Sequence, residues 1–119
     1  MDERYEIAGE GGAAFDLGDR TDVLSGVSKG EGLLRLLSTM GPQVLAADEL
    51  NLTSDVAAVL EAKSRGVDVL CTAHGGTFQE LLRREGMGRL FEGRTFQRYV
   101  RLTGCGQVQE IRDEEGKTL

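Results

Sequence analysis

Two adjacent carboxylates at the end of a short apolar run are the sharpest chemical signal in the sequence. Asp48 and Glu49 directly follow the run "QVLAA", residues 43–47. Such a run is typical of a parallel strand buried on both faces. A buried charge needs a partner or a metal, so the acids belong at the end of the strand, where open α/β sheets bind ligands. In nucleotide hydrolases such an Asp supports Mg²⁺ and such a Glu polarises the attacking water, although a solvated acidic pair starting a loop fits the spacing equally well.

The only histidine of the chain, His74, follows the next apolar run, residues 67–73. One helical segment separates the two runs, so a right-handed crossover can place them side by side and bring His74 near Asp48 and Glu49. Histidine changes its charge near neutral pH, which suits proton transfer or contact with a γ-phosphate. The alternative is a histidine at a strand–loop corner whose ring hydrogen-bonds to the backbone.

Cysteines and arginines give weaker signals. Cys71 lies within an apolar run, which favours a buried, inert thiol over a nucleophilic pair with His74. The two cysteines form no C-x-x-C motif, so the sequence indicates neither a zinc site nor a disulfide framework. A guanidinium can clamp phosphate groups, although most arginines are surface residues. The candidates are Arg4, Arg20, Arg94 and Arg98.

The 17 glycines prompt a search for phosphate-binding loops. The motif G-x-x-x-x-G-K-[ST], whose backbone amides and lysine cradle phosphates, is absent from the sequence. Residues 9–14, "GEGGAA", match G-x-G-x-x-A after an expected strand, but no helical pattern follows on which a pyrophosphate could rest. A small dinucleotide-binding protein therefore stays a minor alternative, and it would bind dinucleotides whatever is changed at Glu49.

Composition limits the classes of protein that remain. The 119 residues are enough for one small domain, residues 1–119, with a modest core. The formal net charge of −6 argues against a standalone nucleic-acid binder. No apolar run approaches the roughly 18 residues of a membrane-spanning helix, and the acidic start is not a signal peptide. We therefore expect a cytoplasmic protein.

Hydrophobic periodicity predicts alternating strands and helices. The expected strands cover residues 2–8, 43–47, 67–73, 96–102 and 107–111, the last two as an antiparallel hairpin. The expected helices begin after Ser28, Ser54 and Thr77, the first and third with S/T-x-x-E capping boxes, and a further helical segment covers residues 87–92. This order predicts an α/β fold, with a mainly parallel sheet flanked by helices and a C-terminal antiparallel hairpin.

Five separated segments together resemble a known family. They are "DERYEIA", "RTDVLSGVSKGEG", "LLRLLSTMGPQVLAADEL", "GVDVLCTAHGGTFQELLRR" and "FQRYVRL", in this order over about residues 1–112. The set looks like the C-terminal half of the ATPase domain in the stage III sporulation protein AA family. That family is similar to the hexameric ATPases of type II and type IV secretion and of pilus retraction.

The resemblance implies a partial RecA-like P-loop NTPase fold and Mg·ATP as the substrate. It places Asp48 as the Walker B metal residue and Glu49 as the catalytic carboxylate. Residues 72–75 fall on the family's His box, which puts His74 near the γ-phosphate. Residues 2–4 align with the acidic box at the end of the second core strand. The residues that we expect to contact ATP are Glu3, Arg4, Thr72 and Arg98.

Two departures from the family pattern bear on activity. The family usually has Gly where this chain has Asn51, and Asn tolerates left-handed backbone conformations. The family's P-loop precedes the "DER" segment, whereas this chain begins at Met1. Without the central P-loop strand, two inner sheet edges would be unpaired and prone to self-association. We therefore expect a truncated ATPase-family domain, from a shortened gene, a misplaced start codon or a partial sequence, that hydrolyses no ATP alone.

A non-enzymatic alternative stays open. A degenerate half-domain could serve as an interaction module on a full ATPase subunit or on an envelope partner. The resemblance also implies a homo-oligomer, which is a hexamer in the related ATPases, and partners from the sporulation channel between mother cell and forespore. We expect a location in the cytoplasm, peripheral to the membrane through these partners, and no binding to nucleic acid.

Overall fold

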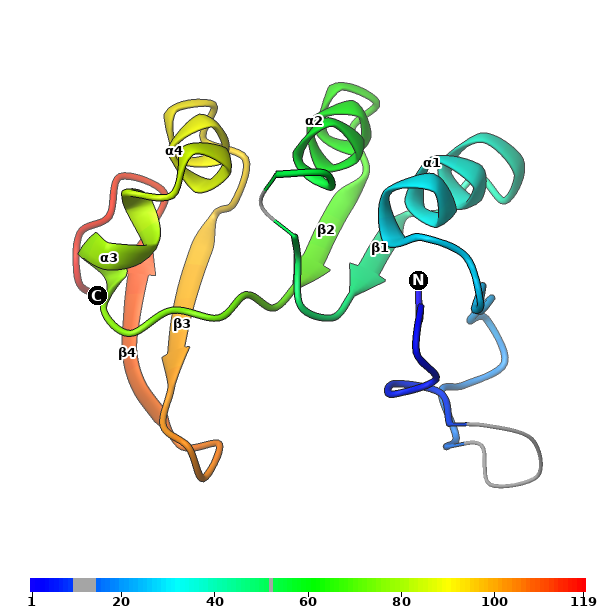
Figure 1. Cartoon of the computed structure of the whole chain (residues 1–119), viewed down its shortest axis with the longest axis horizontal. Coiled ribbons are helices and arrows are strands. Elements are labelled where there is room, and N and C mark those ends of the chain that lie inside the picture. The colour runs from blue at the N-terminus through cyan, green and yellow to red at the C-terminus, as the bar shows by residue number, and fades with distance from the viewer. Residues whose placement is uncertain (10–14, 52) are drawn as a thin grey trace. The chain divides into compact units, whose positions relative to one another are not determined.

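The computed structural model describes residues 1–9, 15–51 and 53–119 and divides into two compact units (Figure 1). The first unit comprises residues 1–74 and the second residues 75–119. Each unit has its own two-stranded sheet, parallel in the first and antiparallel in the second. The described part of the chain is therefore mixed α/β, as expected. No helix in this part is long and apolar enough to cross a membrane.

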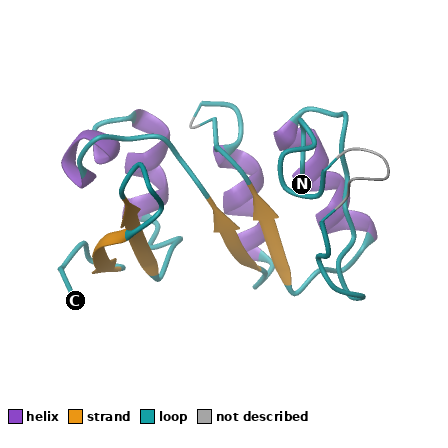
Figure 2. Cartoon of the chain, turned by 90° about the horizontal axis from the view of Figure 1, so that it is seen from below, coloured by secondary structure: helices purple, strands orange, loops and turns teal. Residues whose placement is uncertain are grey.

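The first unit is a strand–helix–strand crossover preceded by a helix. Its two strands pair in parallel, with Val44 opposite Asp68 and Ala47 opposite Cys71. Both helices cover the same face of this sheet (Figures 1 and 2). The elements are α1 (Lys29–Thr39), β1 (Val44–Ala47), α2 (Val56–Ser64) and β2 (Asp68–Cys71).

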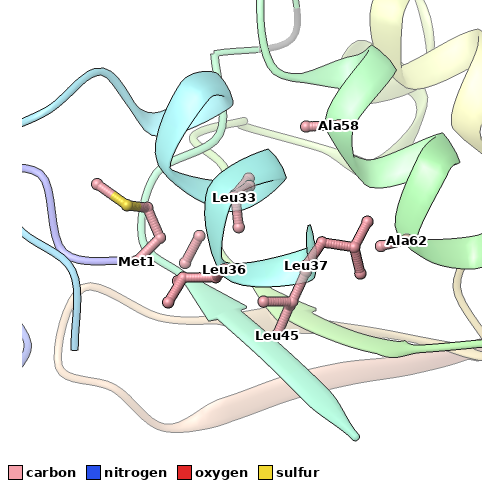
Figure 3. Close-up of a cluster of buried hydrophobic side chains, with 8 residues drawn as sticks. Met1, Leu33, Leu36, Leu37, Leu45, Ala58 and Ala62 are labelled. Carbon is pink, nitrogen blue, oxygen red and sulfur yellow. The ribbon is translucent and has the colours of Figure 1, made fainter. Parts of the chain in front are cut away.

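A hydrophobic core joins the two helices to the sheet (Figure 3). Leu33, Leu36 and Leu37 recur at helical spacing, so they form one apolar face of α1. Burial of each such side chain stabilises the fold by roughly 1.5–3 kcal/mol. From α2, the small side chains of Ala58 and Ala62 complete the cluster and let the two helices pack closely. The predicted parallel pairing of two strands across one helix is confirmed.

The sheet of the first unit is covered on one face only, which corrects the expectation of a strand buried on both faces. Leu45 and Ala47 are buried under the helices, whereas Val44 is 56% and Leu70 is 68% exposed. The physical reason is that α1 and α2, the two helices of this unit, both lie on one face of its sheet.

The strand expected over residues 2–8 is not formed. Only Asp2 pairs in strand fashion, in an isolated bridge with Ser25. The buried Asp2 carboxylate then accepts the N–H groups of Glu6, Ile7 and Ala8 at 2.8, 3.2 and 2.8 Å. These bonds curl the backbone of residues 2–8 around the Asp2 side chain. Asp side chains can compete in this way with the hydrogen bonds of a regular strand.

This buried carboxylate is also electrostatically adapted to its place. Burial alone would raise the pKa of Asp2, but its backbone N–H bonds and the N-terminal ammonium outweigh that effect and lower it. The Met1 ammonium itself donates to the Ala46 carbonyl at 2.7 Å, on the edge of β1 away from β2. Its pKa is lowered, chiefly because the group is partly buried.

The helix starts confirm one predicted capping box and correct the other. Thr77 and Glu80 make both reciprocal bonds of a capping box. The Ser28 side chain makes no capping bond to α1, so the box predicted there is wrong. The N-cap of α2 is Asp55 and not Ser54, while Gly66 takes the left-handed conformation expected after a helix, with φ of 75°.

The second unit packs two short helices against the predicted antiparallel hairpin, which is confirmed. Tyr99 of the hairpin lies 5.2 Å from Phe78 and 5.9 Å from Phe91 between ring centroids, and the Arg112 guanidinium lies over the Phe78 ring. These ring contacts tie the helices to the strands. The elements are α3 (Phe78–Leu82), α4 (Glu85–Glu92), β3 (Arg98–Leu102) and β4 (Val108–Asp113).

Candidate functional site at the carboxyl ends of β1 and β2

The parallel register of β1 and β2 brings the predicted acids and the predicted histidine together. Ala47 and Cys71 are register partners, so the residues after each strand emerge at the same edge of the sheet. Asp48 and Glu49 leave β1 there, and His74 follows β2. The His74 Nε2 atom lies 3.4 Å from Glu49 Oε1. The prediction that His74 lies near the acids is confirmed for Glu49.

Both members of this pair face solvent. The Glu49 side chain is 54% and the His74 side chain 86% exposed. An exposed pair of this kind contributes little to stability, because water screens the charges. It is, however, accessible to a ligand, and a carboxylate beside an imidazole can exchange a proton with it or with a bound water.

The backbone of Glu49 adopts a strained left-handed conformation that Thr72 holds. Its φ is +30°, which is uncommon for a residue with a side chain. The Glu49 N–H donates to Thr72 Oγ1 at 2.8 Å, and the next amide, that of Leu50, donates to the Thr72 carbonyl at 2.7 Å. Thr72 thus holds the turn after β1 through two accepted hydrogen bonds, one at its hydroxyl and one at its backbone carbonyl.

Lys29, which was not predicted as a site residue from the sequence, holds the same turn from the side of α1. Its Nζ donates to the Glu49 carbonyl at 2.7 Å and lies 3.6 Å from Asp48 Oδ1. The side chains of Lys29 and Asp48 are only 10% and 21% exposed. The available signal was a basic residue in the first turn of an expected helix, where the helix dipole disfavours it.

Asp48 carries an oxygen without a hydrogen-bond donor among the described residues. Its Oδ1 atom is buried and accepts no hydrogen bond there. No group of three or more potential metal ligands occurs in the described part of the chain. Mg²⁺, however, usually takes one or two carboxylates and completes its shell with water and phosphate oxygens. The single carboxylate of Asp48 therefore fits a magnesium ion that a phosphate ligand also binds. It does not fit a metal site made of protein ligands alone.

The other predicted ligand-contacting residues are spread over both units. Glu3 and Arg4 lie in the turn that follows Asp2, where Arg4 is exposed. Arg98 opens β3 in the second unit, and its guanidinium donates to the Gln97 carbonyl at 2.7 Å. Contact of these three residues with ATP stays a prediction.

Three weaker sequence signals have different outcomes. Burial raises the pKa of the Cys71 thiol to about 12, so this thiol stays protonated near neutral pH, as expected for an inert side chain. The glycine-rich match at residues 9–14 lies, apart from Gly9, outside the described residues. Asn51, which stands where the family usually has Gly, does not take a left-handed conformation, whereas Glu49 does.

Comparison with known proteins places this geometry in a family context. The family model described as sporulation stage III, protein AA matches residues 1–119. Stage III sporulation protein AA of Bacillus subtilis (strain 168) is 40% identical over 124 aligned residues. The alignment covers 100% of this chain and 40% of that relative, so the chain spans less than half of the relative's length. No solved structure matches. The chain belongs to the stage III sporulation protein AA family.

Proposed function

We propose that this chain supplies the acidic, water-activating side of an Mg·ATP hydrolysis site in a sporulation ATPase. The observation that carries the proposal is the convergence of Asp48, Glu49 and His74 at adjacent ends of two parallel strands. Ligands of open α/β sheets bind at this edge. The resemblance noted above assigns the same residues to the Walker B and His box positions of a RecA-like fold.

Each residue has a role that follows from its surroundings. Asp48, whose side chain is 21% exposed, would hold Mg²⁺ through its carboxylate, and the ion when bound would neutralise phosphate charge. Glu49 projects an exposed carboxylate that can orient a water and accept its proton. His74, 3.4 Å from that carboxylate, can orient it or donate a hydrogen bond to a phosphate oxygen.

The phosphate-cradling part of the site is not among these 119 residues. They contain no G-x-x-x-x-G-K-[ST] motif, whose amides and lysine supply much of the affinity for phosphates. We therefore propose that the polypeptide alone binds ATP weakly and hydrolyses none, and that activity requires a phosphate-binding loop from additional sequence.

The family context extends the proposal to assembly and location. We propose a homo-oligomer, a hexamer by analogy with related ATPases, that works in the cytoplasm against membrane-bound sporulation partners. The net charge of −6 supports partners other than nucleic acid.

A segment exchange tests the catalytic proposal. Residues 1–119 replace the matching segment of the B. subtilis relative, and the chimera is assayed for Mg²⁺-dependent ATP hydrolysis and for heat-resistant spores. Glu49→Gln should lower the hydrolysis rate about a hundredfold or more, because it removes a proton acceptor while keeping the shape. The matched control is Glu61→Gln, which alters a partly exposed helical glutamate paired with Arg65. Equal rates for the Glu49→Gln and parent chimeras would refute the proposal.

The non-enzymatic reading has one observation in its favour. Val44 and Leu70 expose apolar side chains on the uncovered face of the β1–β2 sheet, and exposed apolar surface can mark an interaction site. An interaction module would leave spore formation intact in the Glu49→Gln chimera, and would lose it when Leu70 is changed to Lys. The two proposals therefore predict opposite outcomes in the same assay.

A further inference from the structure

Lys29 lies where simple electrostatics would not place a lysine. It is the first residue of α1, next to the positive end of the helix dipole. Its side chain is almost wholly buried, although a buried ammonium must be paired to offset its desolvation. A contact elsewhere in the fold must therefore determine its position.

That contact is the turn that follows β1, twenty residues further along the chain. The ammonium donates to the Glu49 carbonyl at 2.7 Å, a charge-assisted hydrogen bond of short length. Its distance of 3.6 Å from Asp48 Oδ1 adds an ion pair without a direct hydrogen bond. Lys29 therefore contacts both residues that carry the proposed chemistry, through a backbone oxygen of one and the carboxylate of the other.

We infer that Lys29 is a positioning residue that fixes the strained Asp48–Glu49 turn and so aims the Glu49 carboxylate. Thr72 holds the amide of Glu49, and Lys29 holds its carbonyl, so both peptide groups of this left-handed residue are fastened. The effect of Lys29 on catalysis rests on the proposed function. Its effect on the conformation of the turn does not.

A purely stabilising role explains the lysine less well. Replacing a buried ion pair by apolar groups of similar volume is often neutral or stabilising, so stability gives little reason for a charge here. A methionine would fill the same space as the lysine stem. What the ammonium provides at this place, and a methionine cannot, is a hydrogen bond to a backbone carbonyl beside a carboxylate.

Amide hydrogen exchange on the full 119-residue chain tests the inference without reference to ATP. Lys29→Met should speed exchange of the Glu49 and Leu50 amides about tenfold or more, the factor expected when a charge-assisted hydrogen bond is lost. Lys29→Arg keeps the charge and should retain most of the protection. Lys63→Met, at an exposed lysine on α2, is the matched control and should change neither amide.

A second measurement needs no variant and so survives a failure of Lys29→Met to fold. The chain has three lysines, Lys29, Lys63 and Lys117. Reductive methylation of the native chain should modify Lys29 far more slowly than the other two, and urea should abolish the difference.

The outcomes separate this inference from the proposed function. Unchanged exchange at Glu49 in a folded Lys29→Met variant, or equal methylation of all three native lysines, would overturn the positioning role. If exchange responds as expected but the Glu49→Gln chimera keeps full ATPase activity, Lys29 still positions the turn and the catalytic proposal fails. In an active chimera, Lys29→Met should lower the hydrolysis rate and Lys29→Arg should restore part of it.

Discussion

Two helix starts with the same S/T-x-x-E spacing are built in different ways. At α3, Thr77 Oγ1 accepts the Glu80 N–H at 3.1 Å, and the Glu80 carboxylate accepts the Thr77 N–H at 3.1 Å. At α1, the Ser28 side chain caps nothing, and Glu31 pairs with Arg35 one turn later. The two helices differ in capping because the first turn of each makes different contacts.

The start of α3 is satisfied locally, whereas the start of α1 is a tertiary junction. Lys29, the residue after Ser28, reaches the turn after β1, and the leucines of the same helix pack into the core. A capping box therefore forms where its own residues are the best partners available. Where long-range contacts fix the first turn, the same letters in sequence do not specify the same structure.

The largest expected effect comes from removing a buried leucine that holds α1 in the core. Leu33→Ala should lower the free energy of unfolding by about 2–5 kcal/mol, because it removes a fully buried side chain and leaves a cavity. Urea unfolding followed by circular dichroism measures the change. Leu34→Ala, at an exposed neighbour on the same helix, is the control, and a similar loss there would contradict the tertiary account of α1.

A second substitution tests whether the N-terminal curl also depends on one tertiary side chain. Asp2→Asn should cost about 1–3 kcal/mol at pH 7, because the buried carboxylate accepts three amides. Since its folded pKa is lowered, this stability is present above the unfolded value and is lost as the pH falls through the folded value.

The measurement for Asp2 is urea unfolding at several pH values. The wild-type chain and Asp2→Asn should differ most near neutral pH and converge in acid. A difference that is constant between pH 7 and pH 2 would show that the carboxylate charge has no part in holding the curl.

The smallest expected effect comes from removing the two candidate N-cap side chains, which compares the helix starts directly. Thr77→Ala should destabilise the fold by about 1 kcal/mol, the usual cost of losing an N-cap, while Ser28→Ala should cost only a few tenths of that. Parallel urea titrations of the two variants give the difference. Equal losses would mean that Ser28 caps α1 in solution.

Much of the fold is predictable from the sequence because its signals are local and periodic. The leucine face of α1, the apolar runs of β1 and β2 and the turn-linked hairpin each specify their own element. The proximity of Glu49 and His74 also follows, because a right-handed crossover leaves few other arrangements. The strand expected at residues 2–8 fails because the Asp2 carboxylate offers the backbone a competing set of hydrogen bonds.

The parts of the site that escaped prediction depend on long-range contacts. The ion pair of Lys29 with Asp48 joins residues nineteen positions apart, and no periodic pattern marks it. The left-handed backbone falls on Glu49 and not on Asn51, because Thr72 and Lys29 hold Glu49 while the Asn51 side chain accepts the Thr53 amide. RecA-like topology stays a prediction of the family resemblance.

The double grip on Glu49 has a mechanical consequence. A left-handed glutamate stores conformational energy of about 1–3 kcal/mol, which its surroundings must balance. The balancing bonds come from two different elements, the end of β2 and the start of α1. If either element moves by an ångström or two, one bond breaks and the backbone can relax towards its ordinary conformation, rotating the carboxylate as it does so. The left-handed conformation of Glu49 is therefore maintained only while the start of α1 and the end of β2 keep their spacing.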